Sequence, residues 1–117
     1  MNFDFSRGRI TLVISPTDMR CGFNRLAGIA LSQLNIQISR GRDFVVFVSR
    51  DSTLCKMIWA DERGSSMLTR RLHARRFERF LARIDEAAIR PFTYDDLCAF
   101  LDGERIMVRR ERIHEGK

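Results

Sequence analysis

The sequence predicts a small α+β domain, in which a mainly antiparallel sheet of about four strands packs with helices. Short runs rich in β-branched and apolar residues predict the strands, at about 9–15, 44–49, 54–60 and 66–72. Segments with helical spacing of apolar residues predict the helices, at about 18–35, 75–88 and 93–102. With 117 residues, 44% of them hydrophobic, and two prolines, the chain is long enough for one core, so a single domain over 1–117 is expected.

The first strand, RITLVIS at 9–15, ends where Pro16 follows it. Thr17 then offers an N-cap, and Asp18 would lie in the first turn of a helix that continues to about Asn35. Gly22 and Gly28 lie inside this segment, and each costs about 1 kcal/mol in a helix relative to alanine. We therefore expect either close packing on their face or a break in the helix.

The stretch that follows predicts three antiparallel strands. The run at 44–49 is almost continuously apolar, as in a strand buried on both faces. Residues 50–53 turn the chain, and 54–60 returns. Gly64, in a four-residue connection, can take the left-handed conformation, so 54–60 and 66–72 should form a hairpin. Trp59 and Phe47 could stack on bases, but because they lie in apolar runs they are expected in the core.

The spacing changes after residue 74. Phe77, Phe80, Leu81, Ile84 and Ala88 have the spacing of an amphipathic helix. Arg90-Pro91-Phe92 breaks it, and Thr93 caps a last helix that stops at Gly103. We expect 109–117 to be a mobile charged tail.

Arginines dominate the charge. The formal net charge is +6, and six arginines against one acid lie between Arg70 and Arg83. Guanidinium groups suit phosphate, so this density favours contact with the DNA backbone. The residues predicted to bind DNA are Arg50, Lys56, Arg70, Arg71, Arg75, Arg76 and Arg79. Two other interpretations remain open: a solvated charged face, or a basic surface that docks an acidic protein.

Enzymatic chemistry is not predicted. The aspartates fit positions at helix starts and in turns better than a metal-dependent nuclease site, and no histidine accompanies a nucleophile. The three cysteines, Cys21, Cys55 and Cys98, lack metal-ligand spacing and are expected to be reduced and buried. No cofactor or metal is predicted. No apolar run is long enough to span a membrane, so a cytoplasmic location is expected.

Four segments resemble the small TnpB-type accessory protein encoded by the second open reading frame of bacterial insertion sequences of the sixty-six family. They are PTDMRCGFNRLA (16–27), FVSRDSTLCKMIWADERG (47–64), LTRRLHARRF (68–77) and DEAAIRPFTYDDLCAFLDG (85–103). The resemblance implies an accessory protein that assists transposition beside an element-encoded transposase. It also implies extended chain near Phe77, in conflict with the helix that the apolar spacing predicts. Asp51 departs from the family, in which this turn is usually basic.

Overall fold

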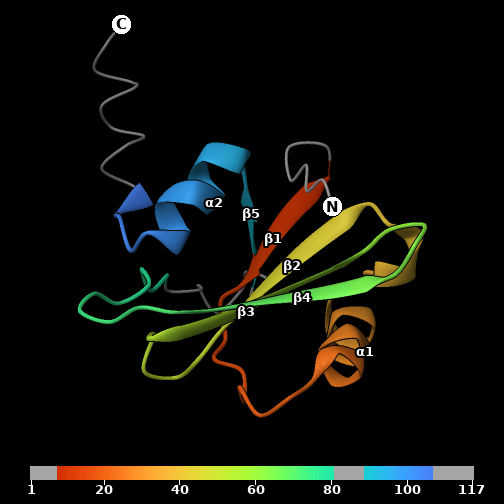
Figure 1. Cartoon of the computed structure of the whole chain (residues 1–117), viewed down its shortest axis with the longest axis horizontal. Helices are drawn as coiled ribbons and strands as arrows, with labels where there is room; N and C mark the ends of the chain where they lie inside the picture. The colour runs from red at the N-terminus through yellow and green to blue at the C-terminus, as the bar shows by residue number, and fades with distance from the viewer. Residues whose placement is uncertain (1–7, 81–88, 107–117) are drawn as a thin grey trace, which may run out of the picture.

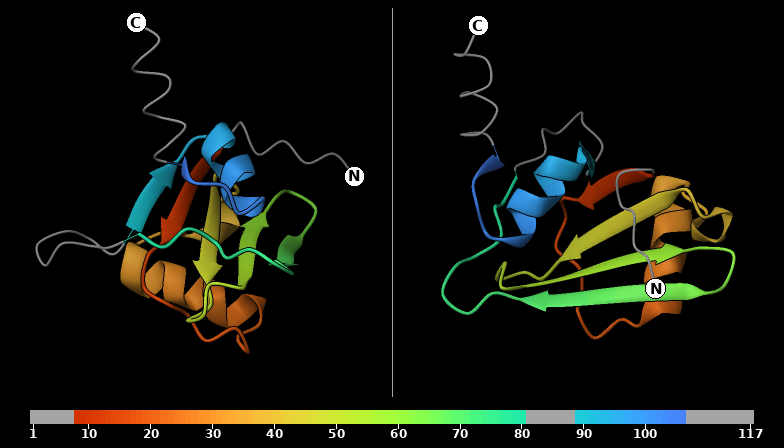
Figure 2. Two further views of the ribbon diagram at one scale, coloured as in Figure 1. Left: turned by 90° about the vertical axis from the view of Figure 1, so that its left-hand side faces the viewer. Right: turned by 45° about the horizontal axis from the view of Figure 1, so that its top comes forward.

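The computed structural model describes residues 8–80 and 89–106. Two helices, α1 (Phe23–Leu34) and α2 (Tyr94–Leu101), lie on opposite faces of one sheet with the strand order β4-β3-β2-β1-β5 (Figure 1, Figure 2). The strands are β1 (Arg9–Val13), β2 (Asp43–Val48), β3 (Leu54–Ala60), β4 (Ser65–Arg71) and β5 (Ile89–Phe92), and a short 3₁₀ helix spans Ile38–Arg40. The predicted α+β class is confirmed.

The sheet is mixed. Strands β2, β3 and β4 form an antiparallel meander whose bounds agree closely with the predicted ones. Strand β1 instead pairs with β2 in parallel, with Ile10 opposite Phe44, because α1 carries the chain back across one face between them. Strand β5 completes the sheet antiparallel to β1.

Strand β5 was not predicted, because Arg90-Pro91-Phe92 was interpreted as the end of a helix. Proline has no N–H to donate to a neighbouring strand and is tolerated where a strand has a free side. Pro91 is in β5 and lies opposite Thr11 of β1. Among the described strands, β5 is an edge strand, so one of its sides has no neighbouring strand and a proline is tolerated there.

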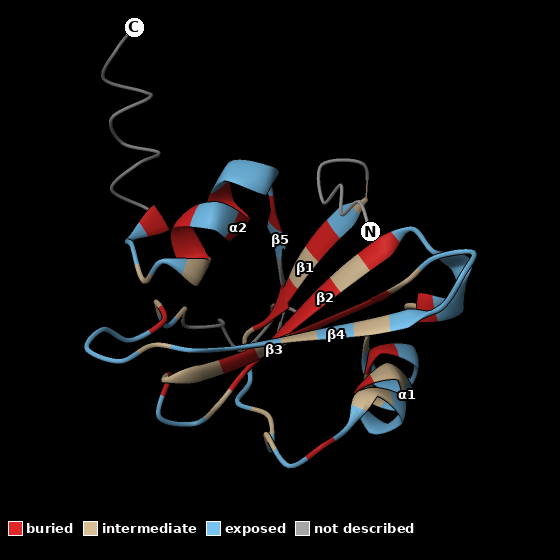
Figure 3. Cartoon of the chain, viewed as in Figure 1, coloured by how far each residue is buried: buried red, intermediate tan, exposed pale blue. Residues whose placement is uncertain are grey.

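Two apolar clusters fill the faces of the sheet. Figure 3 shows that buried residues run through the central strands. On the α2 face, Met57 and Trp59 from the sheet pack with Phe100. On the α1 face, Phe47 packs with Leu26. The prediction that Trp59 and Phe47 belong to the core is therefore confirmed, and alternate residues of the strands face the two clusters.

The first helix begins later than predicted, at Phe23. Residues 18–22 form a turn in which the carboxylate of Asp18 accepts hydrogen bonds from the backbone and the guanidinium of Arg20, so Asp18 is not a first-turn residue. Of the two alternatives expected for Gly22 and Gly28, close packing is found at neither, because nothing lies within 4 Å of a Cβ added there. The helix is interrupted at Gly22, its N-cap, but continues through Gly28. The helix ends at Asn35, which adopts the left-handed conformation.

The helix predicted at 75–88 is wrong for its first part, because residues 72–80 have no helical structure. This segment lies against the β2–β3 turn: the Leu72 N–H donates to the Thr53 carbonyl (2.9 Å), and the Phe77 N–H donates to the Ser52 carbonyl (2.7 Å). The extended chain implied by the family resemblance is thus the one observed. Residues 81–88 lie outside the described part of the chain.

The last helix was predicted correctly. Thr93 and Asp96 form a reciprocal capping box, in which each side chain accepts a hydrogen bond from the other residue's N–H (3.0 and 3.1 Å). Gly103, with φ of 77°, follows the helix in the left-handed conformation. The expected tail at 109–117 lies outside the described residues.

Candidate nucleic-acid interface

The fold brings two arginine-bearing segments together at one end of the sheet. Strand β2 ends and β3 begins there, joined by the turn at 49–53, and β4 ends there and continues into 72–80. We call this surface the basic end and define it by five exposed arginines: Arg50, Arg71, Arg75, Arg76 and Arg79. Figure 3 shows that the chain just after β4 is largely exposed.

Hydrogen bonds to backbone oxygens position two of these arginines. Arg76 Nη1 donates to the Asp51 carbonyl (2.7 Å), and Arg79 Nη2 donates to the Arg50 carbonyl. A carbonyl is neutral, so these bonds orient the guanidinium groups without cancelling their charge. Among the described residues, no carboxylate lies within ion-pair distance of any arginine of the basic end.

The turn that these arginines contact is organised by Asp51. Its carboxylate accepts hydrogen bonds from the Thr53 hydroxyl (2.7 Å), the Ser49 hydroxyl (2.8 Å) and the Thr53 N–H (3.2 Å). These bonds, with a smaller contribution from Arg76, lower its pKa from 3.8 to about 2. A lowered pKa means that ionised Asp51 stabilises the fold above about pH 3.8 and that this contribution is lost as the pH falls toward 2.

Residues 71–79, which we call the basic segment, are anchored by Phe77, whose spacing had predicted a helix face. Phe77 is 2% exposed and stacks on Phe100 of α2, with ring centroids 5.0 Å apart. Beside it, Glu78 accepts a hydrogen bond from the Ile106 N–H (2.6 Å). Apolar residues within an arginine-rich run are the sequence signal for such an anchor, and of Leu72, Phe77 and Phe80 only Phe77 is fully buried.

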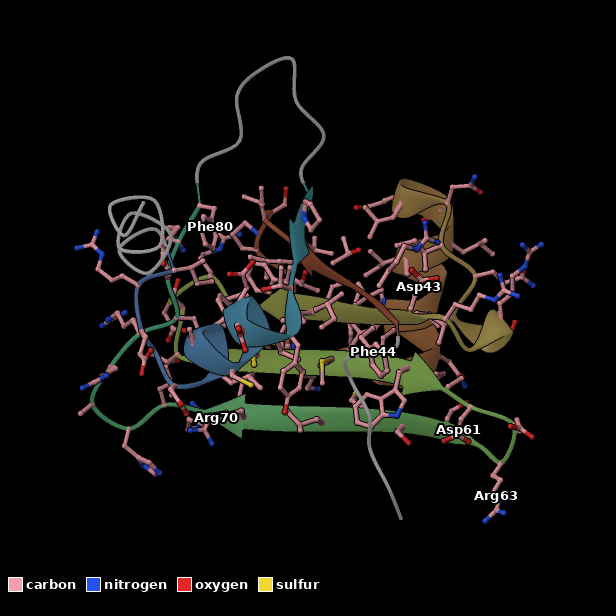
Figure 4. The ribbon with its side chains drawn as sticks, turned by 90° about the horizontal axis from the view of Figure 1, so that it is seen from above. Asp43, Phe44, Asp61, Arg63, Arg70 and Phe80 are labelled. Carbon is pink, nitrogen blue, oxygen red and sulfur yellow. The ribbon has the colours of Figure 1, made fainter. Side chains whose placement is uncertain are left out.

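Arg70, one of the predicted DNA-binding residues, does not belong to the basic end. Its side chain lies on the α2 face (Figure 4), where Nε donates to the Leu101 carbonyl and Nη2 is 3.6 Å from the Asp102 carboxylate. A cation beside the last carbonyls of a helix is favourable. Arg70 therefore stabilises the end of α2, and its charge is partly paired.

Lys56 lies on the α1 face of the sheet, as Arg71 does, but a backbone carbonyl engages its ammonium. It shares the α1 face with Phe47, and its ammonium donates to the Cys21 carbonyl at 2.9 Å. The structure thus brings together five of the seven predicted DNA-binding residues and places Arg70 and Lys56 elsewhere.

A hollow of about 530 Å³ next to the basic end limits the surface available to an anion. Asp18 and Asp51 line it together with Arg50. Hydrogen bonds from Arg20 lower the pKa of Asp18 to about 2, so both carboxylates are ionised at neutral pH. This hollow therefore has two ionised carboxylates beside Arg50, whereas residues 71–79 have one acid, Glu78, among their arginines.

The described residues contain no metal centre or membrane-spanning helix. No group of three or more histidine, cysteine, aspartate or glutamate side chains is placed to hold a metal ion in residues 8–80 and 89–106. Within the same residues, no helix has the length and apolar character needed to cross a membrane. The prediction of buried cysteines holds for Cys21 and Cys55, but Cys98 on α2 is exposed.

The fold and the site define a small, basic α+β domain with an arginine-rich end. The family model described as IS66 Orf2 like protein matches residues 8–111, and the chain belongs to this family, as its sequence resemblance indicated. It is therefore an insertion-sequence accessory protein. A relative in Sinorhizobium fredii (strain NBRC 101917 / NGR234), the uncharacterized protein y4hO, is 41% identical over 69 residues, which cover 59% of each chain. No solved structure matches the chain.

Proposed function

We propose that the protein assists transposition by binding the DNA backbone through the basic end. The observation that carries this proposal is that five exposed arginines occupy one surface without a carboxylate at ion-pair distance among the described residues. Two of them are oriented by backbone carbonyls, which reduces the side-chain entropy lost when a phosphate binds. Such binding would take place in the bacterial cytoplasm, where the element DNA lies.

The arrangement favours contact with phosphates over recognition of bases. The arginines come from turns and extended chain, and neither described helix presents them to a groove. Asp95 and Asp96 lie in the first turn of α2, where they would be repelled by a phosphate. Phosphate contacts position a protein on DNA without reading its sequence, so we expect affinity with little sequence preference.

Fluorescence anisotropy with duplex DNA at several salt concentrations tests this proposal. Arg71 and Arg75 are replaced together by alanine, and Arg63→Ala is the control, because Arg63 is exposed in the β3–β4 turn at the other end of the sheet (Figure 4). Loss of two phosphate contacts should reduce the slope of log K against log salt by about 2. Arg63→Ala should bind as the unmodified protein does. Absence of binding at low salt, or equal slopes for the double variant and the control, would refute the proposal.

A second candidate function is docking to an acidic surface of the transposase without DNA contact. The charges of the basic end favour it in one respect: Asp51 and Glu78 lie among the arginines, and a surface of mixed sign suits a protein partner. Co-purification with the transposase after nuclease treatment would support docking. A complex that survives nuclease but is lost in the Arg71→Ala, Arg75→Ala variant would assign the basic end to the protein partner.

In both cases the proposed role is non-enzymatic. Asp18 serves the turn before α1, and Asp61 accepts hydrogen bonds from the Arg63 and Gly64 N–H groups in the β3–β4 turn. Supercoiled plasmid incubated with the protein and Mg²⁺ or Mn²⁺ should remain intact. Nicking that Asp18→Ala or Asp61→Ala abolishes would contradict this role.

A further inference from the structure

The outer edge of β4 is a row of backbone groups available for pairing. The Asp61 N–H donates to the Gly64 carbonyl, and the Leu72 N–H donates to the Thr53 carbonyl, each at 2.9 Å. With the observed β3–β4 register, the residues bonded to β3 are therefore the even-numbered ones, such as Leu68. The N–H and C=O groups of Ser65, Met67, Thr69 and Arg71 point away from β3. No strand among residues 8–80 and 89–106 pairs with this edge.

We infer that a second copy of the chain pairs with this edge, β4 against β4 in antiparallel orientation, with a two-fold axis at Leu68. This register places Met67 opposite Thr69 of the second copy and Ser65 opposite Arg71. All four outward-facing residues of each copy then form hydrogen-bonded pairs. The two five-stranded sheets become one continuous sheet with both α1 helices on the same face.

The distribution of side chains along β4 fits this arrangement. The apolar residues lie at the centre, where Met67, 40% exposed, is on the α1 face and Leu68, half-buried, is on the α2 face. Contact across the axis would cover both. The hydroxyls of Ser65 and Ser66 lie at one end and the two arginines at the other, so antiparallel pairing sets each arginine against a serine.

Charges beyond the strand ends are complementary in the same register. Asp61 and Glu62 lie with Arg63 in the turn before β4, so the turn has one more acid than base, and Arg75 follows the other end of the strand. Figure 4 shows Asp61 and Arg70 near opposite ends of β4. In the antiparallel dimer, the acidic turn of each copy therefore approaches the arginines that follow β4 in the other. A parallel pairing would instead bring the two sets of arginines together.

The dimer would also separate the two basic ends by the length of the paired strands. Seven residues of β-strand span about 23 Å, so two basic ends would lie on the order of 20 Å apart and face outward at opposite ends of the β4 pair. Dimerisation itself does not depend on the proposed DNA binding and is tested without DNA.

Sedimentation equilibrium at several salt concentrations tests the dimer. The unmodified chain should sediment as a species of twice 13.7 kDa, and Thr69→Pro as a monomer. Proline removes an N–H that faces the free edge and leaves the β3 ladder intact, so the variant should keep its circular dichroism spectrum. Thr69→Ala keeps the N–H and is the matched control. A monomeric unmodified chain, or a dimer that persists in folded Thr69→Pro, would overturn the inference.

Disulfide trapping tests the register of the β4 pair. It also tests whether the dimer forms through β4 if the Thr69→Pro variant does not fold. In a background of Cys98→Ser, Leu68→Cys should cross-link on mild oxidation, because a non-hydrogen-bonded antiparallel pair has its Cα atoms about 4.5 Å apart, within disulfide range. Ser66→Cys lies on the same face and is also half-buried, but its nearest residue in the second copy is Arg70. It should remain uncross-linked. Equal cross-linking of the two variants, or none with Leu68→Cys, would exclude this interface.

Discussion

Replacement of Phe77 by alanine tests whether the core holds the basic segment in place. The ring is 2% exposed and stacks on Phe100 at 5.0 Å with an interplanar angle of 21°. Removal of a buried phenylalanine side chain costs about 3–5 kcal/mol, of which a favourable aromatic pair accounts for about 0.5–1.5 kcal/mol. We expect Phe77→Ala to lower the free energy of unfolding by about 4 kcal/mol. Phe77→Leu keeps most of the apolar volume and should cost about 1.5 kcal/mol.

Urea denaturation, followed by the fluorescence of buried Trp59 and by circular dichroism, measures these changes. His73→Ala is the control, because His73 is exposed in the same segment and its replacement should change stability by less than about 0.5 kcal/mol. A Phe77→Ala variant within about 1 kcal/mol of the unmodified protein would refute the reasoning, since so small a loss is typical of a side chain that does not fill the core.

Two further predictions concern thiols and glycines. A thiol reagent should label Cys98 alone in the native protein and all three cysteines in denaturant. Cys98 is exposed, whereas burial raises the pKa of Cys55 to about 12. Fast labelling of native Cys55 would contradict its burial. Gly28→Ala should stabilise the protein by about 1 kcal/mol, because a helical Cβ there meets open space. Gly103→Ala should destabilise the protein by about 1–2 kcal/mol, because φ at this position is 77° and the added Cβ would lie 3.1 Å from Arg75 Cβ. Thermal unfolding measures both glycine variants, and midpoint temperatures that shift in the same direction would contradict this account.

The parts of the fold that could be predicted from the sequence depend on local signals. The β3–β4 hairpin follows from two apolar runs and a glycine turn, and α2 follows from the cap at Thr93. The spacing of Phe77 and Phe80 is compatible with a helix and also with extended chain whose rings pack on the core. Spacing alone therefore could not decide between them, and the helix that it predicted is not observed. The deciding hydrogen bonds, to Ser52 and Thr53, come from a segment distant in the sequence.

The candidate site shows the same limit. Composition alone identified the arginine-rich stretch, but it could not reveal which cations have partners inside the fold. Arg70 bonds to Leu101, 31 residues away, and Lys56 bonds to Cys21, 35 residues away. These hydrogen bonds are therefore a consequence of tertiary structure that no spacing in the sequence records.

The position of β1 has a consequence for synthesis of the chain. Strand β1 lies between β2, which follows α1, and β5, which is made after β4. A nascent chain can therefore complete the β2–β3–β4 meander while β1 still lacks one neighbour and the α2 face of the sheet is uncovered. Because contacts between distant segments form slowly, closure of the sheet should await release of the last third of the chain from the ribosome. A product truncated before β5 would display apolar surface and an unpaired strand, and we expect it to aggregate or be degraded.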